Sequence, residues 1–168
     1  MIDIQKNLHM SSFPTKIASM MVPEGGKVYN IVITDNKVDN GQLCGRGDYV
    51  SFDQYEQDAV PSDTGTPAVT FAGVIRELGA DGKWIVEVTQ LPKSGEVLYM
   101  YNSPVSEYDE FDLQDEALFY SKQGERIQGA RLDIGDMFSI SANGFEGNDP
   151  TEEAAVTYNE TTHKYTVA

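Results

Sequence analysis

Cysteine and histidine are scarce in this chain, which limits its redox and metal chemistry. Cys44 is the single cysteine, so neither an internal disulfide nor a thiolate zinc cluster can form. The histidines are His9 and His163 only, too few for a histidine-rich metal site. No recognisable cysteine-hydrolase signature surrounds Cys44, and a small buried thiol is the expectation there. A lone cysteine also fits a reducing compartment.

Long apolar runs and basic residues are also lacking. The apolar runs are only a few residues long, so no transmembrane helix is expected. The N-terminus has no basic start followed by an apolar stretch, so we expect no secretory signal. The 12 bases face 27 acids, a net charge of −15. Such a surface repels phosphates and anionic lipids, which argues against nucleic acid and membrane partners. The acidity serves solubility or fits a basic surface or a divalent ion.

The usual catalytic motifs are missing as well. The sequence contains no phosphate-binding glycine loop, no H-E-x-x-H, no G-x-S-x-G and no Rossmann fingerprint. No basic stripe with interleaved aromatic residues is present for single-stranded nucleic acid. We therefore predict a protein that is not an enzyme, with no catalytic, metal or cofactor-binding residues.

The first 24 residues differ from the rest of the chain. Two acids and two bases give residues 1–24 a charge balance of zero, while residues 25–168 carry the whole net charge. The segment has neither helical nor strand periodicity, and Pro14 and Pro23 prevent one continuous helix. It could fold back onto the core or extend as an arm against another subunit. We interpret 1–24 as an N-terminal arm and 25–168 as one β-rich body domain.

Turn and strand signals alternate through the body. The segment 27–34 is rich in β-branched and aromatic residues, and the turn-rich segment 35–41, which superficially resembles a calcium loop, is interpreted as a turn. Asp81-Gly82 predicts a hairpin that pairs 69–78 with 83–91. Further strands are expected at 95–103 and as two short strands within 155–168.

One segment favours a helix, Val105 to Lys122, with Gly124 just past its end. Between Glu107 and Glu116, six of ten residues are acidic. A catalytic carboxylate pair or a metal site could lie in this run, but a solvated face is the better interpretation. The fold class predicted is mainly β, a barrel or sandwich with one short helical segment and an extended N-terminal arm.

An internal similarity links two distant stretches, "GRGDYVSF" (Gly45–Phe52) and "DIGDMFSI" (Asp133–Ile140). The first contains Arg46-Gly47-Asp48, which can act as an adhesion signal in exposed loops. The shared part is Gly-Asp and the strand after it, not the arginine. Because Gly-Asp suits the entry to a strand, we interpret the tripeptide as structural and predict equivalent corners of one barrel or sandwich.

The segment Glu107–Gly147 resembles head decoration or cement proteins of tailed bacteriophages. Tyr108-Asp109-Glu110 matches a first family pattern, and Gly129–Ile140 matches a second, with the order around Arg131 altered. "DNGQLCGRGDY", ending at Tyr49, is similar to a third. The likeness covers about 110 residues, through short motifs made of turn chemistry, and leaves the arm outside.

The resemblance implies a viral structural protein that binds the major capsid protein and stabilises the phage head. Its location would be the head surface of the virion, assembled in the cytoplasm of a bacterial host, and self-association as a homotrimer would be compatible with three-fold positions. The arm residues expected to bury against coat subunits or a sister copy are Leu8, Met10, Phe13 and Ile17. Two alternatives stay open. One is a receptor- or carbohydrate-binding β-module of a tail or fibre, using Trp84, Tyr99 and Tyr101, and the other is an enzyme using the acids of 107–116.

Overall fold

A computed structural model describes residues 28–33, 37–51, 56–60, 70–93, 95–102 and 120–168. The described part is mainly β, as predicted. Its first strands are β1 (Val28–Ile33), β2 (Lys37–Val38), β3 (Leu43–Ser51), β4 (Glu56–Val60), β5 (Ala72–Leu78), β6 (Trp84–Gln90) and β7 (Val97–Tyr101). The others are β8 (Ser121–Lys122), β9 (Arg126–Arg131), β10 (Met137–Ile140), β11 (Phe145–Gly147), β12 (Ala155–Asn159) and β13 (Lys164–Val167), with the 3₁₀ turn η4 (Ala142–Gly144) after β10.

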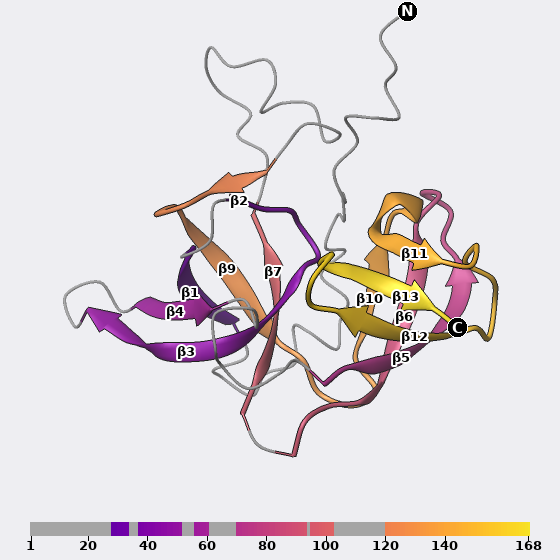
Figure 1. The fold of residues 1–168 in the computed structure, drawn as a ribbon, viewed down its shortest axis with the longest axis horizontal. Helices are drawn as coiled ribbons and strands as arrows, with labels where there is room; N and C mark the ends of the chain where they lie inside the picture. The colour runs from indigo at the N-terminus through magenta and orange to yellow at the C-terminus, as the bar shows by residue number, and fades with distance from the viewer. Residues whose placement is uncertain (1–27, 34–36, 52–55, 61–69, 94, 103–119) are drawn as a thin grey trace, which may run out of the picture.

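Five of these strands close into a barrel in the order β1-β4-β3-β7-β9. β1 pairs in parallel with β4 and antiparallel with β9, and the other pairs are antiparallel. The expected strand at 27–34 is confirmed as β1. Closure leaves the barrel without a free sheet edge. Figure 1 shows it beside a second sheet.

The second sheet has six strands in the order β10-β6-β5-β12-β13-β11. The predicted hairpin is confirmed, since β5 pairs antiparallel with β6 and Gly82 at the turn has φ 80°. The two C-terminal strands are confirmed as the antiparallel pair β12 and β13. A small ribbon joins β2 to β8. Within the part of the chain that the structure describes, no helix is long and apolar enough to cross a bilayer.

Strand β7 is buried on both faces and belongs to both halves of the body. All five of its residues are buried. Leu98 and Met100 pack into a cluster inside the barrel, whereas Val97, Tyr99 and Tyr101 pack into a larger cluster between the barrel and the six-stranded sheet. Because alternate side chains of a strand point to opposite faces, one strand supplies both clusters.

The larger cluster has an aromatic centre. The Phe138 ring lies 4.9 Å from that of Tyr99 and 5.7 Å from that of Tyr165, measured between centroids. Two tyrosine hydroxyls also join the halves through hydrogen bonds. The Tyr165 hydroxyl donates to the Gly41 carbonyl at 2.7 Å, and the Leu43 amide donates to the Tyr158 hydroxyl at 3.1 Å. The two sheets therefore share one packed and hydrogen-bonded interface.

Two expected elements differ from the prediction or lie outside the described residues. The arm at 1–24 and positions 103–119 of the expected helix lie outside them. The prediction that this helix extends to Lys122 is wrong, because Ser121–Lys122 form β8 and pair with β2. Gly124, with φ 83°, belongs to the turn between β8 and β9. Within the expected turn at 35–41, residues 37–38 form β2, and the tight turn is confined to Asn40 and Gly41.

The two Gly-Asp stretches are not equivalent corners of one sheet, which corrects the prediction. Gly47 and Asp48 lie inside β3, where the register against β4 shifts between Arg46 and Tyr49. Gly135, with φ 93°, instead lies in the turn between β9 and β10, which leads into the six-stranded sheet. The first Gly-Asp pair lies at a register shift within a strand, and the second lies in a turn where the chain changes direction. The same two residue types therefore occur in two different backbone conformations.

Candidate functional site at the barrel mouth

Alternation along the barrel strands sends polar side chains to one end of its interior. Ile31, Cys44, Leu98 and Ile127 are buried in the cluster inside the barrel. Two residues away from Ile31, Cys44 and Leu98, and so in the same phase, lie Tyr29, Arg46 and Glu96 respectively. On β9 the position two residues after Ile127 is Gly129, and Arg131 lies four residues after Ile127, again in phase. We call Tyr29, Arg46, Glu96 and Arg131 the mouth network. The ladders agree, because Arg131 lies opposite Leu98 and Tyr29 lies opposite Gly129.

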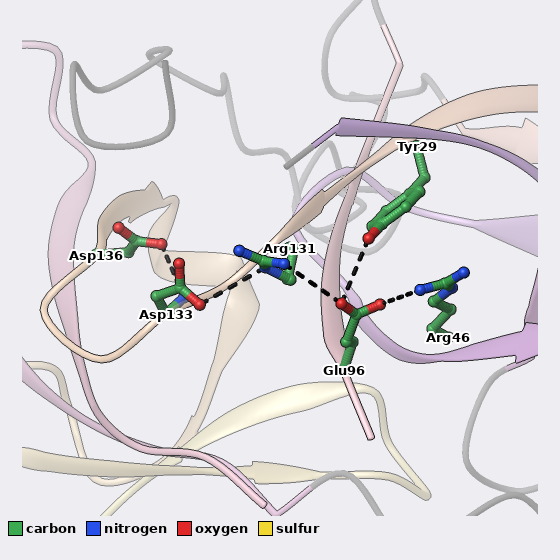
Figure 2. A network of polar contacts seen from close by, with 6 residues as sticks. All are labelled: Tyr29, Arg46, Glu96, Arg131, Asp133 and Asp136. Carbon is green, nitrogen blue, oxygen red and sulfur yellow. Dashed lines mark hydrogen bonds and ion pairs between the residues drawn. The ribbon is translucent and has the colours of Figure 1, made fainter. Parts of the chain in front are cut away.

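Glu96 is the centre of the mouth network, as Figure 2 shows. Its Oε2 accepts a hydrogen bond from Arg46 Nη1 at 2.7 Å. Its Oε1 accepts from the Tyr29 hydroxyl at 3.3 Å and from Arg131 Nη1 at 3.5 Å. The Arg46 guanidinium also lies 4.8 Å from the centroid of the Tyr29 ring, a cation–π arrangement. One carboxylate thus connects side chains from β1, β3 and β9.

The surroundings of Glu96 determine its protonation. Partial burial acts to raise the pKa of its carboxyl group, but hydrogen bonds from Arg46, Arg131 and Tyr29 and the charge of Arg46 outweigh it, so the pKa is lowered. The group is therefore ionised at neutral pH. A carboxylate with a lowered pKa is poorly suited to general acid–base catalysis, which favours pKa values near the working pH. An ionised Glu96 is instead suited to hold β1, β3 and β9 together through its hydrogen bonds.

The network continues into the turn after β9. Arg131 Nε lies 3.6 Å from Asp133 Oδ1. The Asp133 amide donates to Asp136 Oδ2 at 2.8 Å, and the Asp136 amide donates to the Asp133 carbonyl at 3.0 Å. Figure 2 shows these residues as one chain of contacts from Asp136 to Arg46. The polar contacts at the barrel mouth therefore continue without a break into the turn between β9 and β10, which joins the barrel to the six-stranded sheet.

The interior below the mouth is filled by side chains. A Cβ added to Gly129 would lie 3.1 Å from Ile31 Cδ1 and 3.3 Å from Leu98 Cδ1. Cys44 is fully buried there, as predicted, and this burial raises the pKa of its thiol strongly. Small barrels are filled by their own side chains. The mouth network therefore covers a packed core.

The predicted site residues are placed only in part. The arm residues Leu8, Met10, Phe13 and Ile17 and the acidic run 107–116 lie outside the described residues. Among the residues that are described, no group of three or more metal-ligating side chains is close enough to hold an ion. Sequence reasoning noticed Arg46 but missed its partners Tyr29, Glu96 and Arg131. The spacing of these residues from apolar residues of the same strand indicates that they share its inner face, but it does not indicate which strands are neighbours.

Of the three aromatic residues considered for sugar binding, two lie in the core and one packs against it. Tyr99 is 0% exposed and Tyr101 is 7% exposed. Trp84 is partly buried and packs against the larger cluster. The faces of Tyr99 and Tyr101 pack in the core and cannot stack on a sugar ring, so the three residues do not form one exposed aromatic platform.

Comparison with known proteins gives no relative: no family model, no curated protein and no solved structure matches this chain. The described part offers a mouth network whose side chains bind one another, and a joint between two sheets that exposes a single aliphatic side chain, Ile134.

Proposed function

We propose that this chain is a structural protein of a phage head, a decoration or cement protein that binds the major capsid protein. The arm at 1–24 would attach it through Leu8, Met10, Phe13 and Ile17, and the body would lie on the head surface of the virion. Apolar side chains on a segment without net charge suit burial against a protein surface. Several small contacts on one particle would add up to lasting attachment.

One observation carries the proposal. The segment Gly129–Ile140, which resembles the decoration family, covers the end of β9, a tight turn and β10, and so joins the closed barrel to the six-stranded sheet. Its polar groups are used in the mouth network and in the turn. The residues that resemble the family therefore connect the two sheets of the fold, which supports a structural role over a catalytic one. The buried Tyr99 and Tyr101 count against the carbohydrate-binding alternative.

Co-sedimentation with empty capsids of the phage that encodes the chain tests this proposal. We expect saturable binding by the full chain and none after deletion of residues 1–20, with unchanged circular dichroism. Leu8→Asp and Phe13→Asp should weaken binding, and Gln5→Asp, which adds the same charge without removing an apolar side chain, should not. A truncated protein that still decorates capsids fully would contradict the proposal.

A second set of variants tests the enzyme alternative. Asp109→Asn, Glu110→Gln, Asp112→Asn and Asp115→Asn remove four carboxylates of the acidic run. A capsid protein attached through its arm should bind as before, because these residues lie outside the arm. Loss of a measurable hydrolase activity in this variant, with capsid binding absent in both proteins, would favour the enzyme.

A further inference from the structure

The turn between β9 and β10 is a fixed projection with an apolar tip. Ile134 is 69% exposed, more than Val28 at 46% or Leu78 at 51%, the other large hydrophobic side chains exposed in the described part. Hydrogen bonds between Asp133 and Asp136 hold the turn, and the Gly135 amide donates to the Val88 carbonyl at 2.8 Å. A side chain on a fixed backbone loses little entropy when it binds.

Charges of both signs lie beside this tip. The side chain of Arg131 is 30% exposed and that of Asp133 is 48% exposed. Their ion pair is long at 3.6 Å, as is the contact of Arg131 with Glu96 at 3.5 Å, whereas Arg46 reaches Glu96 at 2.7 Å. Within the described part, Arg131 Nε is buried and makes no hydrogen bond, so the exposed portion of this side chain lies elsewhere on it. The Arg131–Asp133 pair is long and partly exposed, and pairs of this kind contribute little, so an exchange of this one contact costs little. The part-buried contact of Arg131 with Glu96 is kept.

We propose that Arg131, Asp133 and Ile134, the turn surface, join two copies of this chain about a two-fold axis. Arg131 of each copy pairs with Asp133 of the other copy, and the two Ile134 side chains meet between them. A two-fold contact requires a self-complementary surface, and this one offers an arginine, an aspartate and an aliphatic side chain. The inference goes beyond capsid attachment and does not depend on it, and it proposes a pair of copies where the resemblance would also allow a homotrimer.

The net charge favours this surface over others for self-association. Each copy carries −15, so two copies that approach through acidic surfaces repel one another. On the turn surface the exposed charges of Arg131 and Asp133 cancel, and the other carboxylate of the turn, that of Asp136, is buried. The neighbouring pair of Arg46 and Glu96 also cancels. The turn surface therefore brings two copies together without adding like charges at the contact, and it excludes an apolar side chain from water.

Sedimentation velocity of the full chain over a range of concentrations tests the pairing. We expect a reversible monomer–dimer equilibrium. Ile134→Asp should weaken it about tenfold or more, the size of effect typical of a central apolar contact. Leu78→Asp is the matched control, because it makes the same change at another exposed site, on the β5–β6 hairpin, and should leave the dissociation constant unchanged. A monomer at every concentration, a trimer, or a dimer that tolerates Ile134→Asp would overturn the proposal.

A charge exchange tests the pairing of Arg131 with Asp133 between copies. Arg131→Glu and Asp133→Arg should each weaken the homodimer, since each places like charges opposite one another twice. An equimolar mixture should associate again, because both contacts then join opposite charges. Circular dichroism checks that each variant is folded. If Arg131→Glu unfolds through its contact with Glu96, Asp133→Arg and Ile134→Asp alone decide. A mixture of folded variants that stays monomeric contradicts the pairing.

Discussion

The hydroxyl group of Tyr165 donates a 2.7 Å hydrogen bond to the carbonyl oxygen of Gly41, across 124 positions of the chain. This bond connects the last strand of the six-stranded sheet to the turn that precedes β3 of the barrel. Both groups are buried, so neither can take a water molecule in exchange without a change in packing. The bond therefore contributes to the cohesion of the two halves.

Tyr165→Phe should destabilise the protein by about 1–3 kcal/mol, because the buried Gly41 carbonyl loses its donor while the ring packing stays. Urea unfolding followed by circular dichroism measures the free energy of unfolding. Thr157→Val, at an exposed position of β12, serves as a control and should change it by less than about 0.5 kcal/mol. A Tyr165→Phe variant as stable as the parent would show that the bond adds nothing.

The two halves should unfold together, because β7 contributes to both clusters. The single tryptophan, Trp84, reports on the six-stranded sheet, and the single cysteine, Cys44, reports on the barrel interior. A thiol reagent should not label the native protein. In urea, labelling of Cys44 by short pulses and the fluorescence of Trp84 should change with the same midpoint. Labelling that precedes the fluorescence change would mean that the barrel opens separately.

Glu96→Gln should reduce stability in a pH-dependent way. At neutral pH we expect a loss of about 1–2 kcal/mol, because the two arginines lose their shared charge. The pKa of Glu96 is lowered in the folded state, so its contribution is complete above the unfolded value of about 4.3. It is lost as the pH falls through the lower folded-state pKa. Urea titrations should therefore show the parent and the variant converging in acid, and a constant difference would contradict this role.

Gly129→Ala should destabilise the barrel by about 1–3 kcal/mol through overpacking. The new Cβ would lie 3.1 Å from Ile31 Cδ1, which is closer than ordinary contact. Thermal unfolding measures the effect. Ala155→Val, an enlargement at an exposed position of β12, is the control and should be tolerated. A Gly129→Ala variant with unchanged melting temperature would show that the interior has room beside β9.

The mainly β class and the β5–β6 hairpin could be predicted from local sequence chemistry. For the hairpin, the two residues Asp81-Gly82 are enough to indicate the turn. The mouth network could not be predicted in the same way. Glu96 receives hydrogen bonds from Arg46 and Arg131, which lie on strands far from it and from each other in sequence. Which strands become neighbours is decided by barrel closure, including the parallel pairing of β1 with β4. Strand periodicity alone contains no such information.

The prediction of two equivalent corners failed because the Gly-Asp motif occurs in two different backbone conformations. Gly47-Asp48 and Gly135-Asp136 look alike in sequence, yet the first lies at a register shift inside β3 and the second in a turn. The predicted C-terminal end of the helix is wrong because, here too, the local sequence does not decide the backbone conformation. Ser121 and Lys122 pair with β2, and this tertiary pairing overrides a local helical preference.

The pairing of β1 with β9 has a consequence for synthesis of the chain. Val28 pairs with Ala130, so the first strand of the barrel leaves the ribosome long before its antiparallel neighbour exists. Until β9 emerges, the barrel cannot close, and Ile31 and Ile33 have no complete interior to enter. Distant pairings of this kind slow folding and prolong exposure of apolar strands. During synthesis the nascent chain therefore passes through an interval in which the apolar residues of β1 have been made but cannot yet be buried in the closed barrel.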